Sequence, residues 1–371
     1  MMKKTLATLL CCAALTACNG AGHPSPTPSS ETTPPEEHRL SLLFAGDLMQ
    51  HGGQIKAALQ ADGTYSYEEC FRWLKPEVER ADVAIANFEV TLAGPPYKGY
   101  PQFSAPDDYL RDVIDTGFDV LLTANNHCLD RYQHGLERTI LMMDSLGVPH
   151  LGTYTNAANR ARQYPFLLEK NGLRVVLLNF TYSTNGIGVT PPNQVNYIDT
   201  LQIAQDIAKA RQMNPDCIIA IPHWGIEYTQ TPVQSQVDLA DWLLRNGCDH
   251  VIGGHPHVAE PIELRPGGHL VAYSLGNVVS NQSTPNTYGG CMVRLDLLKT
   301  DSLTTLEDCG YCLYFVSRPA EGKRKQFRIY PIDHPDSLLN ATERTRRNTI
   351  RTSMRNLMQK HNKGNIKEYG F

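Results

Sequence analysis

The chain has 371 residues, 41% hydrophobic and 19% charged, which is enough apolar material for a folded body of one large domain or two. Its 34 basic and 38 acidic side chains give a net charge of −4, which excludes the strongly basic nucleic-acid-binding proteins. Beyond the N-terminus, no apolar run approaches the ~18 residues of a membrane-spanning helix.

The first 38 residues are predicted to be an export signal and a tether. Lys3 and Lys4 precede a short apolar run, so residues 1–17 read as a signal peptide. Leu15-Thr16-Ala17-Cys18 is similar to a bacterial lipobox, which predicts cleavage before Cys18 and lipidation of that cysteine. An ordinary secretory signal with a chance cysteine is the alternative. Residues 18–38 would then be a lipidated cysteine and a disordered, proline-rich tether, which anchors an exported protein to the cell envelope, at the outer surface or in the periplasm.

From residue 39 onward, short apolar strands alternate with amphipathic helices, which is typical of an α/β domain. The predicted strands are 40–46, 82–89, 118–125, 173–180, 216–223 and 249–255. The predicted helices are 66–80, 107–116, 134–146, 199–212 and 233–246. After residue 258 the pattern changes to successive β segments, and a helical period returns near 340–360. A second sheet packed on the first would account for this change.

Two C-terminal features have alternative interpretations. Cys309 and Cys312 form an isolated CxxC pair, which indicates structural thiols or a local bridge more than a zinc site. The last predicted helix carries a row of arginines, typical of a solvated face, although docking onto an anionic surface is the alternative. These arginines are Arg344, Arg346, Arg347, Arg351 and Arg355.

Polar side chains follow the ends of five predicted strands, and the carboxyl ends of strands are where open α/β sheets bind ligands. They are Asp47, then Asn87 and Glu89, then Asn125-Asn126-His127, then His223, and finally His255 and His257. Mixed oxygen and nitrogen ligands of this kind suit Mn, Fe or Zn better than Ca. A carboxylate can bridge two ions, and Glu89 is the central acid of the set.

In this order, these motifs resemble the CapA family of poly-γ-glutamate capsule biosynthesis proteins, which is similar to the calcineurin-like metallophosphoesterases. The matching stretches are Phe44-Ala45-Gly46-Asp47, Ala86-Asn87-Phe88-Glu89, Asn125-Asn126-His127 with Asp130, His223-Trp224-Gly225 with Glu227, Gly254-His255-Pro256-His257 and Tyr273-Ser274-Leu275-Gly276-Asn277. The resemblance implies an α/β fold, a two-sheet β-sandwich flanked by helices, with a metal site at the strand C-terminal edge. Residues 39–285 would form the metallophosphoesterase-like domain, and residues 286–371 would complete it.

The resemblance also implies a role for each site residue. The implied metal ligands are Asp47, Glu89, Asn126, His223, His255 and His257. His127 resembles the general acid that protonates a leaving oxygen, and Asp130 and Glu227 would orient imidazoles or a water.

The sequence departs from the superfamily pattern at two places. Asp47-Leu48-Met49 has no histidine where the superfamily has Asp-x-His, and His51 lies two residues further on. Glu89 stands where an aspartate is usual. A site with one metal ion is therefore the alternative to a site with two.

The resemblance predicts a surface lipoprotein of capsule or poly-γ-glutamate biosynthesis with a metal-dependent, phosphoesterase-like hydrolase site holding two divalent ions, Mn, Fe or Zn. Its expected partners are the membrane, through the lipid, and capsule or polyglutamate synthesis proteins. The alternatives are a non-catalytic assembly or export component of an envelope polymer machine and a substrate-binding lipoprotein of a transporter.

Overall fold

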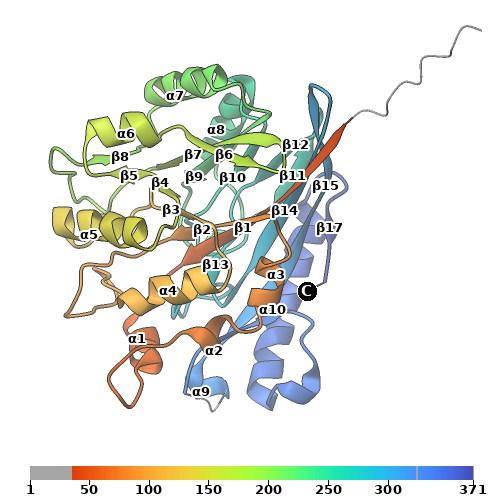
Figure 1. Cartoon of the computed structure of the whole chain (residues 1–371). Coiled ribbons are helices and arrows are strands. Elements are labelled where there is room, and N and C mark those ends of the chain that lie inside the picture. The colour runs from red at the N-terminus through yellow and green to blue at the C-terminus, as the bar shows by residue number, and fades with distance from the viewer. Residues whose placement is uncertain (1–35, 323–324, 371) are drawn as a thin grey trace, which may run out of the picture. The chain divides into compact units, whose positions relative to one another are not determined.

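The computed structural model describes residues 36–322 and 325–370 (Figure 1). The predicted signal peptide, Cys18 and nearly all of the tether lie outside these residues. Strand β1 begins at Glu37, inside the predicted tether, so the folded body starts two residues earlier than predicted. Among the described helices, none has the length and apolar character needed to cross a membrane.

The first sheet is built around β1, which has β2 on one side and β14 on the other, in the order β16-β15-β14-β1-β2-β3-β4. β1 pairs in parallel with β2 and antiparallel with β14, and β13 adds to its carboxyl end. The strands are β1 (Glu37–Leu48), β2 (Val83–Phe88), β3 (Val120–Leu122), β4 (His150–Leu151), β13 (Asn277–Val279), β14 (Gly289–Thr300), β15 (Leu303–Ser317), β16 (Arg328–Pro331) and β17 (Lys367–Glu368), the last on β15.

The second sheet has the order β11-β12-β10-β9-β7-β6, with parallel central strands and antiparallel edges. Its strands are β6 (Phe166–Lys170), β7 (Leu173–Thr181), β9 (Cys217–His223), β10 (His250–Ile252), β11 (Ile262–Arg265) and β12 (His269–Ala272). A small separate ladder joins β5 (Thr153–Tyr154) and β8 (Gln194–Val195).

The apolar pattern of β1 explains how the first sheet is covered on both faces. Leu42 and Phe44 belong to the same core cluster as the buried side chains of β7 and β9. Leu43 and Ala45 point to the opposite face, because side chains alternate along a strand, and they pack with Tyr109 of α4. Each fully buried Leu or Phe contributes about 1.5–3 kcal/mol. This arrangement confirms the predicted two-sheet sandwich flanked by helices.

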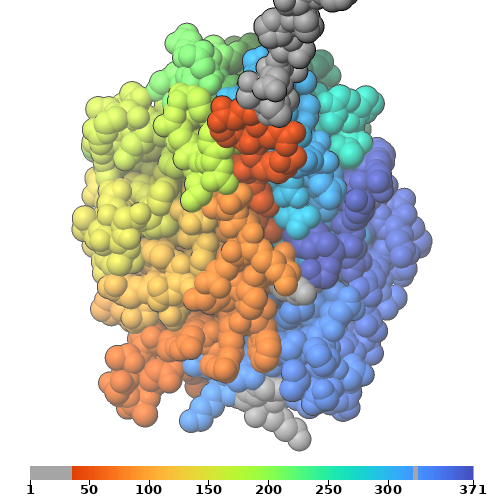
Figure 2. All heavy atoms as spheres, turned by 45° about the vertical axis from the view of Figure 1, so that its right-hand side comes forward, coloured from red at the N-terminus to blue at the C-terminus, as the bar shows by residue number. Residues whose placement is uncertain are grey.

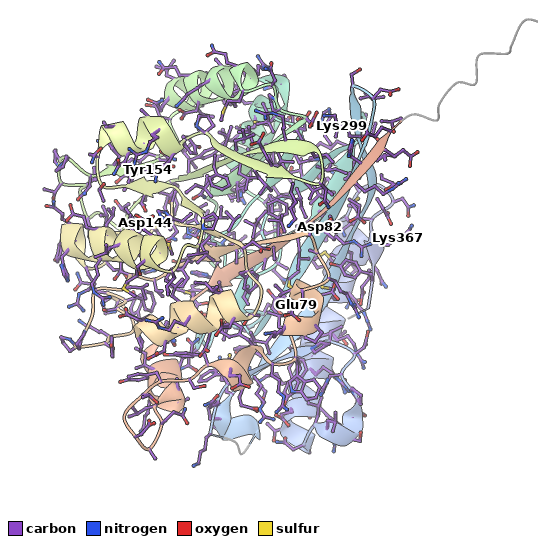
Figure 3. The ribbon with its side chains drawn as sticks, in the orientation of Figure 1. Glu79, Asp82, Asp144, Tyr154, Lys299 and Lys367 are labelled. Carbon is purple, nitrogen blue, oxygen red and sulfur yellow. The ribbon has the colours of Figure 1, made fainter. Side chains whose placement is uncertain are left out.

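An aspartate directly before each of four parallel strands fixes the register of the two sheets. Each carboxylate accepts a hydrogen bond of 2.7–2.8 Å from a backbone N–H of the neighbouring strand. The four are Asp82, Asp119, Asp216 and Asp249, and Figure 3 labels Asp82 at the start of β2. A slip by one residue would turn a buried face toward solvent, so these contacts also keep the strand ends aligned at one edge.

The helices cover the outer faces of the sheets, α4 on the first and α7 and α8 beside the second (Figure 1). The helices are α1 (Gly52–Ala58), α2 (Glu68–Phe71), α3 (Lys75–Val78), α4 (Asp107–Asp115), α5 (Tyr132–Ser145), α6 (Ala157–Gln163), α7 (Thr200–Gln212), α8 (Gln234–Arg245), α9 (Pro319–Gly322) and α10 (Ala341–His361).

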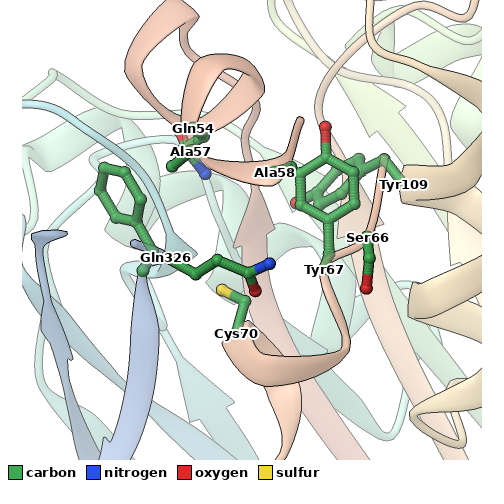
Figure 4. A pocket seen from close by; sticks show the side chains of 9 residues that line it. Gln54, Ala57, Ala58, Ser66, Tyr67, Cys70, Tyr109 and Gln326 are labelled. Atoms are coloured by element: carbon green, nitrogen blue, oxygen red, sulfur yellow. The ribbon is translucent and has the colours of Figure 1, made fainter. Parts of the chain in front are cut away.

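The prediction of one helix over 66–80 was wrong, because two short helices, α2 and α3, share this segment. Pro76 is in the first turn of α3. Proline there suits a helix start, but in a continuous helix its ring would clash with the carbonyl four residues earlier. A water-sized cavity of about 10 Å³ lies against this region, lined by Ala58, Tyr67 and Cys70 (Figure 4), and it is too small for a ligand.

The C-terminal segments pack against the early helices. In Figure 2 their blue surface adjoins the orange surface of the first helices, where Arg328 pairs with Glu69. Several arginines of α10 are neutralised: Arg347 is buried and pairs with Asp336, and Arg355 pairs with Glu368. The seven cysteines from Cys70 onward are free and buried, so Cys309 and Cys312 are thiols without a local bridge.

Candidate metal centre

The two sheets deliver the candidate ligands to one edge of the sandwich. Asp47 lies at the end of β1 and Glu89 directly follows β2, both in the first sheet. His223 ends β9, and His255 and His257 follow β10, in the second sheet. All five side chains are at most 2% exposed. The fold therefore buries two carboxyl groups and three imidazoles between the carboxyl ends of its strands.

Glu89 is common to two clusters of potential metal ligands. Asp47, Glu89 and His223 form one cluster, and Glu89, His255 and His257 form the other. Within each cluster, one ligand atom from every residue lies within 4.8 Å of the others. Glu89 Oε1 is 3.8 Å from both His223 Nε2 and His257 Nε2. Glu89 would therefore be within reach of an ion held by either cluster.

The hydrogen bonding of these atoms fits a pair of cations. Glu89 Oε1 and His255 Nδ1 are buried and have no hydrogen-bond partner among the described residues. Leaving a buried polar atom unpaired costs roughly 1–3 kcal/mol, and more for a charged group. A divalent ion in each cluster would satisfy these lone pairs, so the residues present fit the metal ions that the sequence predicts.

The pKa shifts of the two carboxyl groups, Asp47 and Glu89, are also consistent with a cation site. Burial and the nearby Asp47 raise the pKa of Glu89 well above its ordinary value. Burial also opposes ionisation of Asp47, but the hydrogen bond and charge of His257 leave the pKa of Asp47 below its ordinary value. Without a cation, burial and Asp47 therefore favour the protonated form of Glu89, while His257 favours the ionised form of Asp47. A bound cation would favour the ionised form of Glu89.

Burial favours the neutral form, which can bind metals, in two of the imidazoles. Burial lowers the pKa of His223 to about 3, and it lowers the pKa of His255 well below its ordinary value, with neighbouring histidines adding to the effect. A neutral imidazole keeps a lone pair on one ring nitrogen for a ligand bond.

The loop that carries His255 and His257 has an unusual backbone. Both residues have positive φ angles, 102° and 60°, which a side chain with a Cβ rarely adopts. Such strain costs about 1–3 kcal/mol per residue and needs support from the surroundings. Here Asn277 Nδ2 donates to the His257 carbonyl at 3.2 Å, and Tyr228 N donates to the Pro256 carbonyl at 2.8 Å. The two imidazoles are therefore held in fixed positions.

Asn126 and His127 lie on the loop after β3, at the side of the cluster. Asn126 Oδ1 is 2.8 Å from His223 Nε2, so potential metal-ligand atoms of Asn126, Glu89 and His223 lie near one another. His127 Nδ1 is 2.8 Å from Asp130 Oδ2, and the latter also accepts from the Phe103 backbone N–H at 2.8 Å. Asp130 thus fixes the His127 ring and leaves its Nε2 for another partner.

A cleft of about 750 Å³ opens beside the cluster, lined by His127, Asp130 and His257 among others. Glu227 is exposed on its wall, and among the described residues its carboxylate makes no hydrogen bond to a ligand imidazole. His51 also lines the cleft and is absent from both ligand clusters. Met49, at the position of the missing superfamily histidine, lines the same cleft with a thioether.

Sequence reasoning gave no role to three asparagines that organise the site. Asn87 Nδ2 donates to Asp47 Oδ1 at 2.7 Å and to Glu89 Oε2 at 3.0 Å. Asn125 Nδ2 in turn donates to Asn87 Oδ1 at 3.0 Å, and Asn185 contacts both Asn126 and His127. Asn87 and Asn125 were visible as polar residues at strand ends, but nothing in the sequence distinguishes Asn185 from a turn residue.

Comparisons with known proteins identify the family of this chain. Residues 41–282 match the model of the family described as "Bacterial capsule synthesis protein PGA_cap". The chain is 28% identical over 286 residues to the capsule biosynthesis protein CapA of Bacillus anthracis, covering 72% of this chain and 67% of that protein. It is also 28% identical over 276 residues to the PGA biosynthesis protein CapA of Bacillus subtilis, covering 70% and 68%.

One solved structure supports the fold, and a second is reported for comparison. A putative 5′-nucleotidase from Staphylococcus aureus aligns with a TM-score of 0.50 and 15% identity, covering 85% of this chain and 58% of that one. This chain therefore spans less than two thirds of that protein. A calcineurin-like phosphoesterase from Bacillus subtilis aligns with a TM-score of 0.47 and 16% identity, covering 87% and 99%. Because the family model matches most of the folded body, the chain belongs to the bacterial capsule synthesis protein family, PGA_cap.

Proposed function

We propose that this protein is a metal-dependent hydrolase that cleaves a phosphoester during the biosynthesis of a capsule or related envelope polymer, and that a lipid on Cys18 anchors it to the cell envelope. The observation that carries the proposal is the buried Glu89, shared by two ligand clusters at the edge of an open cleft. Asp47, Glu89, Asn126, His223, His255 and His257 would hold two divalent ions, Mn, Fe or Zn. When bound, such ions polarise phosphoryl oxygens and lower the pKa of water.

The chain's own contribution to the chemistry is the placement of a proton. His127 lines the cleft, and Asp130 accepts the hydrogen bond from its Nδ1. His127 Nε2 is then the atom that would give a proton to the oxygen of the leaving group. Asn185 Nδ2 lies 3.4 Å from His127 Nδ1 and packs the same side of the ring, which restricts the direction in which Nε2 points.

The test combines metal content with turnover of two substrates by the full-length protein, one with a poor and one with a good leaving group. We expect His127→Ala to keep its metal and to lose roughly 10²–10⁴ of kcat on the poor leaving group, with a smaller loss on the good one. We expect His255→Ala to lose metal and activity together on both substrates. His134→Ala is a matched control, because His134 is exposed on α5.

Two results would contradict the proposal. If His127→Ala retained wild-type turnover on the poor leaving group with full metal content, His127 would not be the acid. If the metal-loaded wild type turned over no phosphoester in a broad panel, the alternative of a non-catalytic assembly or export component would be favoured. Met49 is the observation on the side of that alternative, since it replaces a potential ligand at the cleft.

A further inference from the structure

The cleft beside the metal centre has a lining that selects for charge. Its charged residues include Asp130 and Glu227, and among the described residues that line it there is no lysine or arginine. Asp47 and Glu89 do not line the cleft, but they add two more carboxyl groups next to His257, which does. A polyanion such as a γ-linked glutamate chain, with one carboxylate on every residue, would therefore meet no cationic track in this cleft.

One guanidinium that acts on the cleft residue His51, that of Arg318, is engaged by other groups. Arg318 donates to the Gln282 backbone carbonyl and lies over the Tyr288 ring, 4.8 Å from its centroid. It supports the loop that forms the cleft wall from behind, and Arg318 is not among the lining residues.

Neutral hydrogen-bonding groups replace charge on the walls. Amide and hydroxyl side chains both donate and accept, so they suit a ligand whose groups do the same, such as a sugar hydroxyl. The side chains of this kind in the cleft are Gln102, Asn185, Asn281, Gln282, Ser283 and Thr284.

Exposed tyrosines stand at the same cleft. Tyr100 is 73% exposed and Tyr228 is 40% exposed, and they come from different loops of the chain. Tyr182, 44% exposed, does not line the cleft and lies over His255 of the metal centre, with the ring centroids 4.5 Å apart. Exposed aromatic rings around one cavity mark a binding surface, because a ring offers a flat apolar face with a polar hydroxyl at its edge. The C–H face of a sugar ring packs on such a surface while its hydroxyls reach the amides.

We propose that the cleft binds an uncharged glycan, so that the substrate of this site is a phosphoester carried on a neutral oligosaccharide and not on a polyglutamate chain. The inference rests on the proposed function in one respect: it takes the cleft to be the substrate site of the hydrolase. The metal centre receives the phosphoryl group, and the tyrosines and amides hold the sugars next to it.

The test measures binding, so that its result does not depend on turnover. Metal-loaded His127→Ala protein is titrated with neutral tetrasaccharides of glucose, galactose, mannose and N-acetylglucosamine, and separately with γ-linked tetraglutamate, at low and high salt. We expect at least one neutral tetrasaccharide to bind with little salt dependence and more tightly than tetraglutamate. Tyr100→Ala and Tyr228→Ala should each weaken that binding about tenfold, because each removes an aromatic face on which a sugar ring packs. Tyr132→Ala is the matched control, because Tyr132 is 60% exposed and does not line the cleft.

A substitution that adds charge provides the converse measurement. Ser283 is exposed on the cleft wall, and Ser283→Lys should strengthen tetraglutamate binding several-fold in low salt, a gain that high salt should remove. Tighter binding of tetraglutamate than of every neutral tetrasaccharide by the protein with Ser283 would overturn the inference, as would a panel in which no neutral tetrasaccharide binds. Glycan binding without phosphoester turnover by the metal-loaded protein with His127 would instead refute the hydrolase proposal alone.

Discussion

Glu260 makes the stability of this protein depend on pH in a way that one substitution should remove. Its side chain is fully buried, Oε2 accepts a hydrogen bond of 2.7 Å from Gln236 Nε2, and Oε1 has no partner among the described residues. Gln236 also accepts from the Val233 N–H at 2.9 Å, at the start of α8. A Cβ on Gly225 would lie 2.8 Å from Gln236 Nε2, so this pair supports the loop after His223.

The size of the effect follows from the pKa of the buried carboxyl group. Burial raises the pKa of Glu260 from 4.5 to about 8, against the smaller opposite effect of Gln236. The folded protein therefore keeps a proton that the unfolded chain releases, and the free energy of unfolding falls as pH rises between these two values. The slope is about 1.4 kcal/mol per pH unit, and the total loss between about pH 5 and pH 8 is about 3 kcal/mol. Above the folded pKa the loss levels off.

Urea unfolding of the wild type and Glu260→Gln at about pH 5, 6.5 and 8 measures this loss. The amide cannot ionise, so the variant should become more stable relative to the wild type by about 3 kcal/mol over this range. Taking the difference between two proteins of equal metal content cancels the other titrating groups. Glu68→Gln, at an exposed position on α2, is the matched control and should run parallel to the wild type. Parallel curves for Glu260→Gln would show that the buried carboxyl group is ionised in the folded state and would refute the reasoning.

Three further predictions concern the metal, the strand packing and the anchor. Glu89→Gln should reduce metal content, measured by elemental analysis, more than Asp130→Asn does, because Glu89 belongs to both ligand clusters. Loss of a residue that only orients a ligand, as Asp130 does, typically lowers metal affinity ~10–100-fold. Equal metal content in the wild type and Glu89→Gln would exclude bridging. Gly46→Ala should lower the free energy of unfolding by at least ~1–3 kcal/mol, because the new Cβ would lie 1.8 Å from the Gly276 carbonyl oxygen. Gly188 has open space around it, so Gly188→Ala should leave the stability unchanged. Thermal unfolding of the two variants compares these effects. Cys18→Ala should release the exported protein from the membrane fraction, and membrane partitioning of that variant together with an unlabelled wild type in lipid labelling would refute the anchor.

Sequence patterns predicted which polar residues lie together at the edge of the sheets. They did not predict the contacts between side chains from distant segments. Asp47, Glu89 and the three histidines were found because each ends a strand, and parallel strands bring their carboxyl ends to one edge. The role of Asn87 depends on its distance from two carboxylates, which no spacing along the chain encodes. The walls of the cleft come from loops, whose positions are set by tertiary packing.

The break between α2 and α3 shows a different kind of failure. Pro76 was present in the printed sequence, but the apolar period over 66–80 continues through it, and the periodicity outweighed the proline in the prediction. The proline determined the structure, because inside a helix it lacks the backbone N–H and its ring clashes with a carbonyl one turn earlier. Favourable apolar spacing at the other positions does not remove this local clash.

Asp47 and Glu89 come from one sheet and the histidines from the other. An ion bound at this centre would therefore cross-link the two layers of the sandwich. Such an ion binds only while the layers are packed together, so by mass action it would oppose their separation, by about 2.7 kcal/mol at a hundredfold excess over Kd. The supply of metal would then govern the lifetime of the protein as well as its chemistry. In a metal-starved environment the layers would part more often, and proteases would reach the apolar side chains between them.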